Sequence, residues 1–349
     1  MKLTIAVTGM NGRADNPGPG IAVARCLKEA AGFEVRIVGL GYEALDPGLY
    51  LDDLVDAAWL LPYPSHGEEA FLARLTAIHA EEQIDVIIPC LDAELPVFVR
   101  IAPALSDLGI RHFLPGRDQL LLRGKDQLPA LAERTGLMAP ATKAIYSPDF
   151  FYQAESAGFR FPLVVKGLFY DAKVVHNAVD AIAAFHHIAH DWGMPVLVQQ
   201  FLTGEEVNLA GVGDGKGGLA GAVMMKKRAL TDKGKAWAGV SIDDPELLAA
   251  ARTLCEATHW QGGFELEMLC DAEGRHHLIE INPRFPAWIY FSAGVGRNLP
   301  EQLVKLALDQ KAPPLPPAEA GMMFIRYAME VMVPLAQFEA VTMHARRQS

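Results

Sequence analysis

The sequence predicts a mixed protein in which an α/β domain comes first and α+β layers of mainly antiparallel strands follow. Strand-like and helix-like segments alternate over residues 1 to about 115, which is typical of a parallel sheet. From about Arg117 onward, strands follow one another with few helices between them, which indicates antiparallel layers. A chain of 349 residues is also too long for one ordinary core, so two or three packed units are expected.

In the front region, short apolar runs alternate with helix-like segments. The expected strands are residues 3–8, 34–40 and 85–89, and the expected helices are residues 21–31, 68–82 and 94–108. The glycine-rich loop 9–20 lies between a strand and a helix, where α/β sheets bind phosphate or carboxylate ligands. Its glycines are not spaced GxGxxG, which disfavours a dinucleotide site. The loop either helps to hold an acidic or amino-acid-like substrate through Arg13 and Asp15, or is a turn shaped by Gly and Pro.

The second region contains more strands than helices. The expected strands are residues 142–146, 162–166, 173–176, 196–201, 205–212 and 219–225, and the expected helices are residues 126–135 and 179–191. Residues 312–317 are rich in proline and indicate a linker. Residues 322–333 are the candidate for a final strand that returns to the body of the protein.

Composition and charge limit the class of protein. A net charge of -11 argues against a general nucleic-acid binder, which needs clustered Lys and Arg. The four cysteines are scattered without a CxxC pair, as expected for buried thiols in a reducing compartment rather than for a zinc site or disulfides. No stretch has the apolar core of a signal peptide or the length of a membrane span, so a cytoplasmic protein that binds neither nucleic acid nor membrane is expected.

Residues 264–281 predict a hairpin with side chains suited to a metal ion. Residues 264–269 alternate between apolar and polar, residues 271–274 supply a turn, and residues 276–281 run back. Glu280 and Asn282 are two apart and so share a strand face, and Glu267 joins them if the partner strand is in register. Two carboxylates and an amide oxygen suit a hard cation such as Mg²⁺. The alternative is the solvated face of a surface hairpin.

Three cations complete a candidate phosphate site. Arg284 follows Pro283 directly after the hairpin, where its guanidinium can clamp a phosphate beside the carboxylates. Lys166 ends an apolar strand and Lys125 precedes a helix. Each lysine alone is most simply a surface cation, but together with the hairpin they can flank the phosphates of a nucleotide.

Two further stretches offer ligand groups. Residues 196–208 predict a buried strand, a short apolar linker and a turn. Backbone groups of the linker can hydrogen-bond the edge of an adenine, and Glu206 after the turn can accept the ribose hydroxyls. The alternative is a plain hairpin. Residues 224–237 concentrate five cations within ten positions. In an acidic protein this cluster indicates an anion site, with Lys226 and Arg228 as the candidates, although a solvated loop is the alternative.

The order and spacing of these motifs resemble the ATP-grasp superfamily. The matching residues are Lys125, Lys166-Gly167, residues 199–206, Glu267 and residues 280–284. The segment 279–284 is most similar to the branch that includes carbamoyl-phosphate synthase large chains and related carboxylate–amine ligases. The resemblance covers most of the chain and implies an N-terminal Rossmann-like pre-ATP-grasp domain (1–115) before a two-subdomain ATP-grasp module. The module would comprise an N-terminal subdomain (116–197) and a C-terminal subdomain with the metal hairpin (198–311), followed by a Pro-rich linker and a C-terminal strand or tail (312–349).

The resemblance assigns a role to each matching residue. Lys125 and Lys166 would contact the phosphates of ATP. Gln199, with the backbone of Gln200 and Leu202 and the intervening Phe201, would bind adenine, and Glu206 would hold ribose. Glu267, Glu280 and Asn282 would bind one or two Mg²⁺ ions, or Mn²⁺ in their place. Arg284 would steady the γ-phosphate or an acyl phosphate. Lys226 and Arg228 lie outside the matching motifs, and their basic cluster alone makes them candidates to contact phosphate or the substrate carboxylate.

One loop departs from the family pattern. The family has a flexible glycine-rich loop after the lysine-glycine pair, whereas residues 168–173 of this chain are bulkier. Either Tyr170 and Lys173 take over the role of that loop or the lid is stiffer.

The implied reaction is that of an ADP-forming ligase. A carboxylate is activated as an acyl phosphate and an amine then displaces the phosphate to form a C–N bond, with an amino acid or a peptide-like molecule as substrate. Two alternatives remain: a bicarbonate-activating enzyme similar to carbamoyl-phosphate synthase or a carboxylase, and a non-catalytic ATP-binding regulatory protein. A homodimer through the front domain is the assembly that the resemblance suggests.

Overall fold

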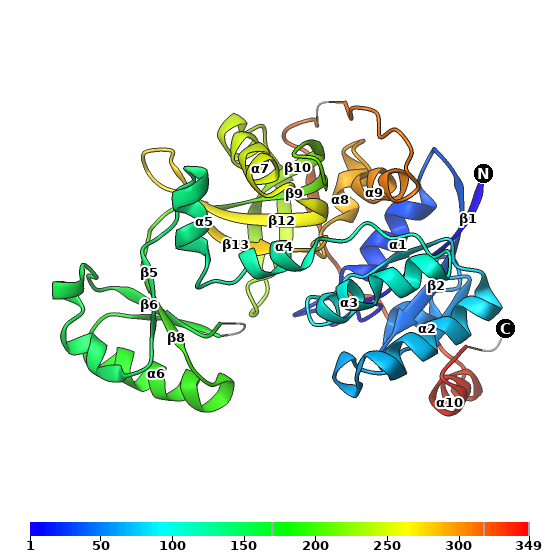
Figure 1. The fold of residues 1–349 in the computed structure, drawn as a ribbon, viewed down its shortest axis with the longest axis horizontal. Helices are drawn as coiled ribbons and strands as arrows, with labels where there is room; N and C mark the ends of the chain where they lie inside the picture. Colours follow the sequence, from blue (N-terminus) through cyan, green and yellow to red (C-terminus); the bar gives the residue numbers. More distant parts are fainter. Residues whose placement is uncertain (169–170, 317, 348–349) are drawn as a thin grey trace. The chain divides into compact units, whose positions relative to one another are not determined.

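The computed structural model describes residues 1–168, 171–316 and 318–347, and the chain forms two compact units (Figure 1). The larger unit comprises Met1–Arg117, Asn208–Glu265 and Asn282–Ser349. The smaller unit comprises Asp118–Val207 and Leu266–Ile281.

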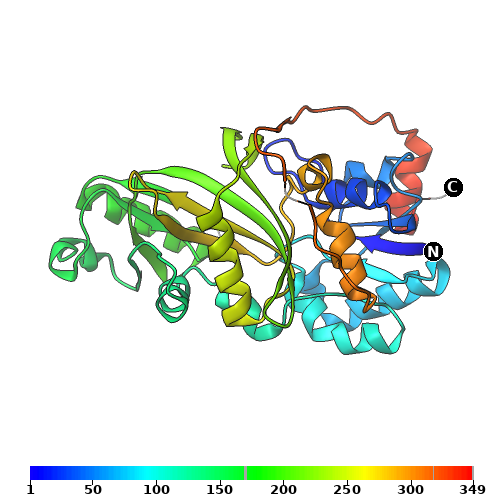
Figure 2. The ribbon, with the colours of Figure 1, turned by 90° about the horizontal axis from the view of Figure 1, so that it is seen from above.

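The larger unit contains a four-stranded parallel sheet, as the alternation of segments in the front region predicts. Its strand order is β3-β2-β1-β4, with β1 at Lys2–Val7, β2 at Glu34–Gly41, β3 at Ala57–Leu60 and β4 at Val86–Ile88. Helix α1 (Gly20–Lys28) covers one face, and α2 (Glu68–Glu82) and α3 (Leu95–Asp107) cover the other (Figure 2). Because both faces are covered, the strands are almost continuously apolar and buried.

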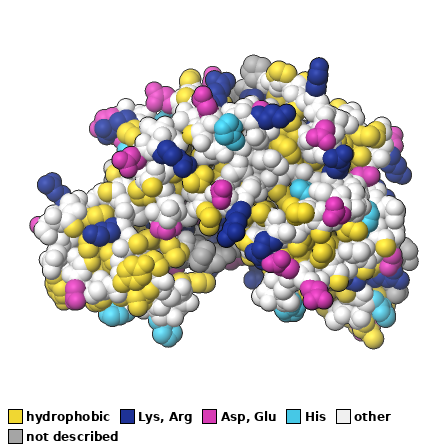
Figure 3. Space-filling model, viewed as in Figure 1, with side chains coloured by type: hydrophobic (Ala, Val, Ile, Leu, Met, Phe, Trp, Pro, Cys, Tyr) yellow, Lys and Arg dark blue, Asp and Glu magenta, His cyan; other side chains and the backbone are white. Residues whose placement is uncertain are grey.

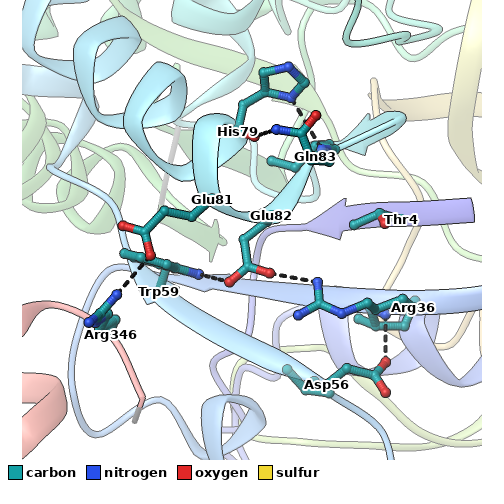
Figure 4. A network of polar contacts seen from close by, with 12 residues as sticks. Thr4, Arg36, Asp56, Trp59, His79, Glu81, Glu82, Gln83 and Arg346 are labelled. Atoms are coloured by element: carbon teal, nitrogen blue, oxygen red, sulfur yellow. Dashed lines mark hydrogen bonds and ion pairs between the residues drawn. The ribbon is translucent and has the colours of Figure 1, made fainter. Parts of the chain in front are cut away.

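A polar network fastens α2 to the edge of this sheet (Figure 4). Glu82 accepts a hydrogen bond from the Trp59 indole at 2.8 Å and pairs with Arg36 at 2.6 Å. One residue earlier, Glu81 pairs with Arg346 at 2.8 Å. Neighbouring acids of one helix end therefore hold β2, β3 and a segment near the C-terminus.

A second sheet has six strands in the order β13-β12-β9-β10-β11-β14. Its strands are β9 (Glu205–Asp214), β10 (Leu219–Leu230), β11 (Ala236–Ser241), β12 (Gln261–Cys270), β13 (His276–Asn282) and β14 (Met323–Ile325). The helices of this part of the chain are α7 (Pro245–Thr258), α8 (Tyr290–Gly294) and α9 (Leu299–Ala307). The predicted hairpin is confirmed as β12 and β13, with the turn closed by a hydrogen bond from the Gly274 N–H to the Asp271 carbonyl at 3.0 Å.

The C-terminal segment differs from the expected strand over residues 322–333. Only Met323–Ile325 pairs with β11, and residues 326–334 continue without a turn or bend until α10 (Leu335–His344) begins. Beyond α10, Arg346 forms an antiparallel bridge with Trp59 at the edge of the parallel sheet. The segment thus lies along two edges of the larger unit instead of forming one long strand.

The smaller unit is built on a four-stranded antiparallel sheet of order β5-β8-β6-β7. Its strands are β5 (Thr142–Ile145), β6 (Leu163–Lys166), β7 (Ala172–Val175) and β8 (Val196–Gln200), and its helices are α4 (Arg117–Leu122, beginning at the last residue of the larger unit), α5 (Leu128–Thr135) and α6 (Ala178–Trp192). Helix α6 lies along one face of the sheet (Figure 1) and buries Phe185 and Ile188 in its core. Asn177 caps this helix by accepting a hydrogen bond from the Asp180 N–H at 3.0 Å.

Charged and hydrophobic side chains are interspersed on the face of the molecule that Figure 3 presents, without a continuous basic surface. None of the helices that the structure describes is long and apolar enough to cross a membrane.

Candidate active site

In the smaller unit, Lys166 ends β6 with its ammonium group almost completely buried. Its exposed fraction is 5 %, and its Nζ donates a hydrogen bond to Oε1 of Gln199 at 2.9 Å. The Gln199 Nε2 in turn donates to Oγ1 of Thr142 at 2.8 Å, which fixes the amide orientation. Burial, with a smaller contribution from the nearby charge of Lys125, lowers the pKa of Lys166 to about 8. An anion placed beside this lysine would favour its charged form.

Lys125 and Glu280 come together in the same unit. The Nζ of Lys125 lies 3.4 Å from Oε1 of Glu280, and both side chains are largely shielded from solvent. The charge of Glu280 also opposes the fall in the Lys166 pKa, so the carboxylate acts on both lysines. The smaller unit therefore gathers Lys125, Lys166, Gln199 and Glu280, which come from four separate segments of the sequence.

Strand β8 ends at Gln200, and the polar groups of this residue are partly engaged. The N–H of Gln200 donates to the Ala141 carbonyl at 2.8 Å, and its side chain bonds the backbone of Arg160. Adenine recognition by the Gln200 backbone would therefore use its carbonyl. Phe201 and Leu202 follow outside any strand and are half-buried, and Glu206 is exposed near the start of β9.

The turn before β9 requires glycine. A Cβ atom at Gly204 would lie 2.3 Å from the Cys270 carbonyl oxygen at the end of β12. This close approach explains why the sequence has glycine between the linker and Glu206.

In the larger unit, Glu265 is the centre of a buried hydrogen-bond group. Its carboxyl oxygens accept hydrogen bonds from Nδ2 of Asn208 (3.0 Å), Nδ2 of Asn282 (3.0 Å) and Nε1 of Trp288 (2.7 Å). Glu265, Asn208 and Asn282 are each at least nine-tenths buried. Since the Asn282 nitrogen is bound to Glu265, its Oδ1 points the other way, where Nη2 of Arg284 lies 3.5 Å from it.

Arg284 is held by a second carboxylate. Its Nε donates to Oδ2 of Asp92 at 2.7 Å, and its Nη1 donates to the Phe285 carbonyl at 3.2 Å. The guanidinium is thereby fixed beside the Asn282 amide oxygen, within the same unit.

The donor chemistry of the predicted metal ligands fits Mg²⁺. Glu267 and Glu280 contribute carboxylates, and Asn282 offers an amide oxygen that Glu265 orients, so all the donors are oxygen. Among the described residues, no group of three His, Cys, Asp or Glu side chains is arranged to hold a metal.

The remaining predicted residues lie in more open surroundings. Lys226 is half-buried and Arg228 exposed on β10, where the pairing with β11 shifts register between Lys227 and Ala229. This irregularity interrupts the strand geometry on which a shared face of Lys226 and Arg228 depends. Lys173 is exposed on β7, and Tyr170 lies outside the described residues.

Asp92, Asn208 and Glu265 belong to the hydrogen-bond groups around the candidate residues Asn282 and Arg284, and none of them was predicted from the sequence. The sequence did contain a signal for Glu265, because Glu265 and Glu267 are two residues apart on one strand and therefore share a face. Asn208 and Asp92 carried no such signal, since only the fold brings them to Glu265 and Arg284.

The fold is that of the ATP-grasp enzymes, and the comparisons with known proteins confirm the predicted resemblance. The model of a family described as "ATP-grasp in the biosynthetic pathway with Ter operon" matches residues 193–328. None of the curated protein sequences compared matches the chain.

Solved structures align over most of the chain at low sequence identity. A biotin carboxylase–βγ-ATP complex from Campylobacter jejuni aligns with a TM-score of 0.68 at 17% identity, over 89% of this chain and 72% of that chain. An L-amino acid ligase from Bacillus licheniformis gives 0.64 at 18% identity, over 88% and 74%. An N5-carboxyaminoimidazole ribonucleotide synthetase from Thermotoga maritima gives 0.61 at 16% identity, over 91% and 78%.

Proposed function

We propose that this chain is an ATP-dependent, ADP-forming ligase that activates a carboxylate as an acyl phosphate for attack by an amine. The observation that supports this most directly is the grouping of Lys125, Lys166, Gln199 and Glu280 in the smaller unit. Two cations beside a carboxylate suit a nucleotide phosphate that carries a divalent metal. The L-amino acid ligase among the similar structures supports an amino acid or peptide-like substrate.

In this proposal each candidate site residue has a defined role. Lys125 and Lys166 hold the phosphates, Gln199 and the linker 200–202 receive adenine, and Glu206 receives ribose. Glu267, Glu280 and the oriented oxygen of Asn282 bind Mg²⁺, one ion or two, with Mn²⁺ as a substitute. When bound, the metal neutralises charge on the transferring phosphoryl group.

Three cations remain for the reacting groups. Arg284, held in place by Asp92, steadies the acyl phosphate with its guanidinium. Lys226 and Arg228 attract the carboxylate substrate, with Lys173 as an additional phosphate contact.

We also infer the domain organisation and location that accompany this function. Residues 1–115 form a Rossmann-like pre-ATP-grasp domain, residues 116–197 and 198–311 the two subdomains of the module, and residues 312–349 the linker and tail. The covered parallel sheet of the front region supports the first part of this division. The scattered thiols support a cytoplasmic location.

The proposal is tested by measuring ADP release from Mg·ATP with panels of amino acids, small peptides and bicarbonate. ADP formed only when a carboxylate and an amine are both present is the expected result. Glu280→Gln should lower the rate at least ~100-fold, whereas Glu273→Gln, in the turn of the same hairpin, should leave it unchanged. Equal rates for the parent and Glu280→Gln would contradict the proposed mechanism.

A bicarbonate-activating enzyme is the second candidate, favoured by the biotin carboxylases among the similar structures. It predicts ADP release with bicarbonate alone. Nucleotide binding without turnover on every panel would instead indicate a non-catalytic ATP-binding protein.

A further inference from the structure

Strand β14 ends the six-stranded sheet, and its outer edge is open in the described part of the chain. Its inner edge pairs with β11, where Phe324 lies opposite Gly239 and Met323 opposite Val240. The Phe324 ring packs against the core, with its centroid 5.1 Å from that of Phe291. An open edge of this kind is a template for pairing with another strand.

The side chains on and beyond this edge are apolar and exposed. The exposed fractions are 51% for Met323, 70% for Ile325, 74% for Tyr327 and 71% for Met329. Residues 326–334 contain no turn or bend, and residues 327–333 make no hydrogen bond with the described residues. Figure 2 shows this segment arching from the six-stranded sheet to α10 at the rim of the larger unit. Exposed apolar stretches of this length commonly mark interaction sites.

The sequence of the segment is complementary to itself. Read outward from Ala328, Tyr327 is matched by Met329, Arg326 by Glu330, and Ile325 by Val331. When two antiparallel strands pair about a two-fold axis at Ala328, Arg326 of each copy lies opposite Glu330 of the other. The same register places Tyr327 opposite Met329 and Ile325 opposite Val331, twice each.

The state of Arg326 agrees with this arrangement. Its N–H is used inside the unit, donating to the Trp237 carbonyl at 2.9 Å. Its Nε is buried without a hydrogen-bond partner among the described residues. A carboxylate supplied by a second copy would give the guanidinium an acceptor.

We propose that this chain forms a two-fold symmetric homodimer in which residues 325–331 of two copies pair as antiparallel strands about Ala328. The proposal commits to a second copy of this chain, because self-pairing about Ala328 sets Arg326 opposite Glu330 and apolar residues opposite each other. It differs from a dimer through the front domain and does not depend on the proposed ligase activity.

A charge exchange in the full chain tests the register. Sedimentation velocity over a range of concentrations should show a species with twice the 37.9 kDa of one chain. Arg326→Glu or Glu330→Arg alone places like charges opposite each other at two positions and should weaken the dimer at least ~10-fold. The double variant Arg326→Glu/Glu330→Arg should restore it. A parent that is monomeric at every concentration, or a double variant as weak as the single ones, overturns the proposal.

Cysteine cross-linking tests the position of the two-fold axis independently of charge. For every variant, the melting temperature shows whether the chain is folded. In a Cys270→Ser background, Ala328→Cys places two thiols directly opposite each other, at a separation suited to a disulfide. It should cross-link under mild oxidation. Ile325→Cys should not, because its opposite residue is Val331, but a mixture of Ile325→Cys and Val331→Cys chains should. Failure of Ala328→Cys, as expected if another segment or another protein covers this edge, overturns the proposal.

Discussion

At the scale of single residues, the buried ammonium group of Lys166 costs free energy in the ligand-free protein. Burial lowers its pKa from 10.5 to about 8, which corresponds to about 3 kcal/mol. A lysine with a lowered pKa destabilises the folded state fully below pH 8, where both states are protonated. This penalty disappears as pH rises from 8 to 10.5, because the folded state then loses its proton first. If Lys166 binds phosphate as proposed, it reduces the stability of the ligand-free protein in the service of function.

Lys166→Met therefore has a stability effect that depends on pH. The variant loses the hydrogen bond to Gln199 at every pH but also loses the cost of the buried charge. Between pH 7 and pH 9.5, the unfolding free energy of the variant relative to the parent should fall by about 2 kcal/mol, since only the parent recovers stability. Urea unfolding at both pH values measures this, and Lys216→Met, at an exposed position, controls for the removed charge. Parallel pH curves for Lys166→Met and the parent would rule out the burial argument.

Glu265 holds the amide of Asn282, a proposed metal ligand, so its substitution should affect both folding and turnover. Glu265→Gln replaces one acceptor oxygen by a donor that faces other donors. We expect a loss of about 1–3 kcal/mol of stability. The rate of ADP release should fall more than ATP affinity, because the Asn282 oxygen loses its orientation. Unfolding and nucleotide-binding measurements are compared with those of Glu273→Gln; a slower reaction with unchanged stability would contradict the hydrogen-bond argument.

The alternating pattern of this strand contains both carboxylates, but it did not predict that Glu265 is buried in a hydrogen-bond group while Glu267 is the candidate ligand. Alternation puts Glu265 and Glu267 on one face of β12, and only Glu267 was selected as a ligand. That Glu265 is buried depends on Asn208 and Trp288, which are distant in sequence and contact it only in the folded chain. A local pattern contains no information about such contacts.

At the scale of elements, the close contact at Gly204 controls how the turn before β9 meets the end of β12. In Gly204→Ala, the new Cβ would lie 2.3 Å from the Cys270 carbonyl oxygen, so backbone must move. We expect a loss of about 1–3 kcal/mol in unfolding free energy. Gly294→Ala is the matched control, because this glycine in α8 has no atom within 4 Å of the new Cβ. Equal unfolding free energies for the two variants would show that the turn relaxes freely.

The segment after α10 lies along the edge strand β3, and two adjacent arginines attach it. We expect the buried Arg347 to contribute more to stability than the more exposed Arg346. Arg347 donates to the Leu49 carbonyl at 2.9 Å and the Val55 carbonyl at 2.5 Å, and its side chain is 8% exposed. The side chain of Arg346 is 43% exposed and pairs with Glu81 at the surface. Arg347→Ala should cost about 2–3 kcal/mol and Arg346→Ala less than about 1 kcal/mol, as measured by urea unfolding. The reverse order would show that the surface pair is the stronger attachment.

Element boundaries were predictable where the local sequence pattern decides them. Helix α2 begins and ends where the sequence pattern predicts, and the hairpin of β12 and β13 was found from its alternation and turn. The strand expected over 322–333 is limited to β14 in the structure. The reason is that β11 pairs only with Met323–Ile325, so the residues that follow have no neighbouring strand to pair with. The register shift after Lys227 also had no local signal, since it arises from pairing with β11.

At the scale of the whole molecule, the predicted ligands lie on β12, on β13 and in the segment directly after β13. Glu267 and Glu280 belong to the smaller unit, whereas Asn282 and Arg284 belong to the larger one. The order of motifs along the sequence was sufficient to predict the ATP-grasp resemblance. It was not sufficient to predict a substrate, because the residues that would select one come from loops whose spatial neighbours the sequence does not specify.

Nucleotide and metal should therefore stabilise the chain only together. If Mg·ATP binds the folded protein and not the unfolded chain, unfolding becomes harder by about 2.7 kcal/mol at a ligand concentration of about 100 times Kd. Thermal unfolding should shift upward with Mg·ATP, and chelation of the metal with EDTA should remove most of the shift. Glu280→Gln should lose the shift because it removes a proposed metal ligand and the partner of Lys125, whereas Glu273→Gln should keep it. A shift that survives both chelation and Glu280→Gln would mean that ATP binds without these carboxylates, and the metal assignment would then be wrong.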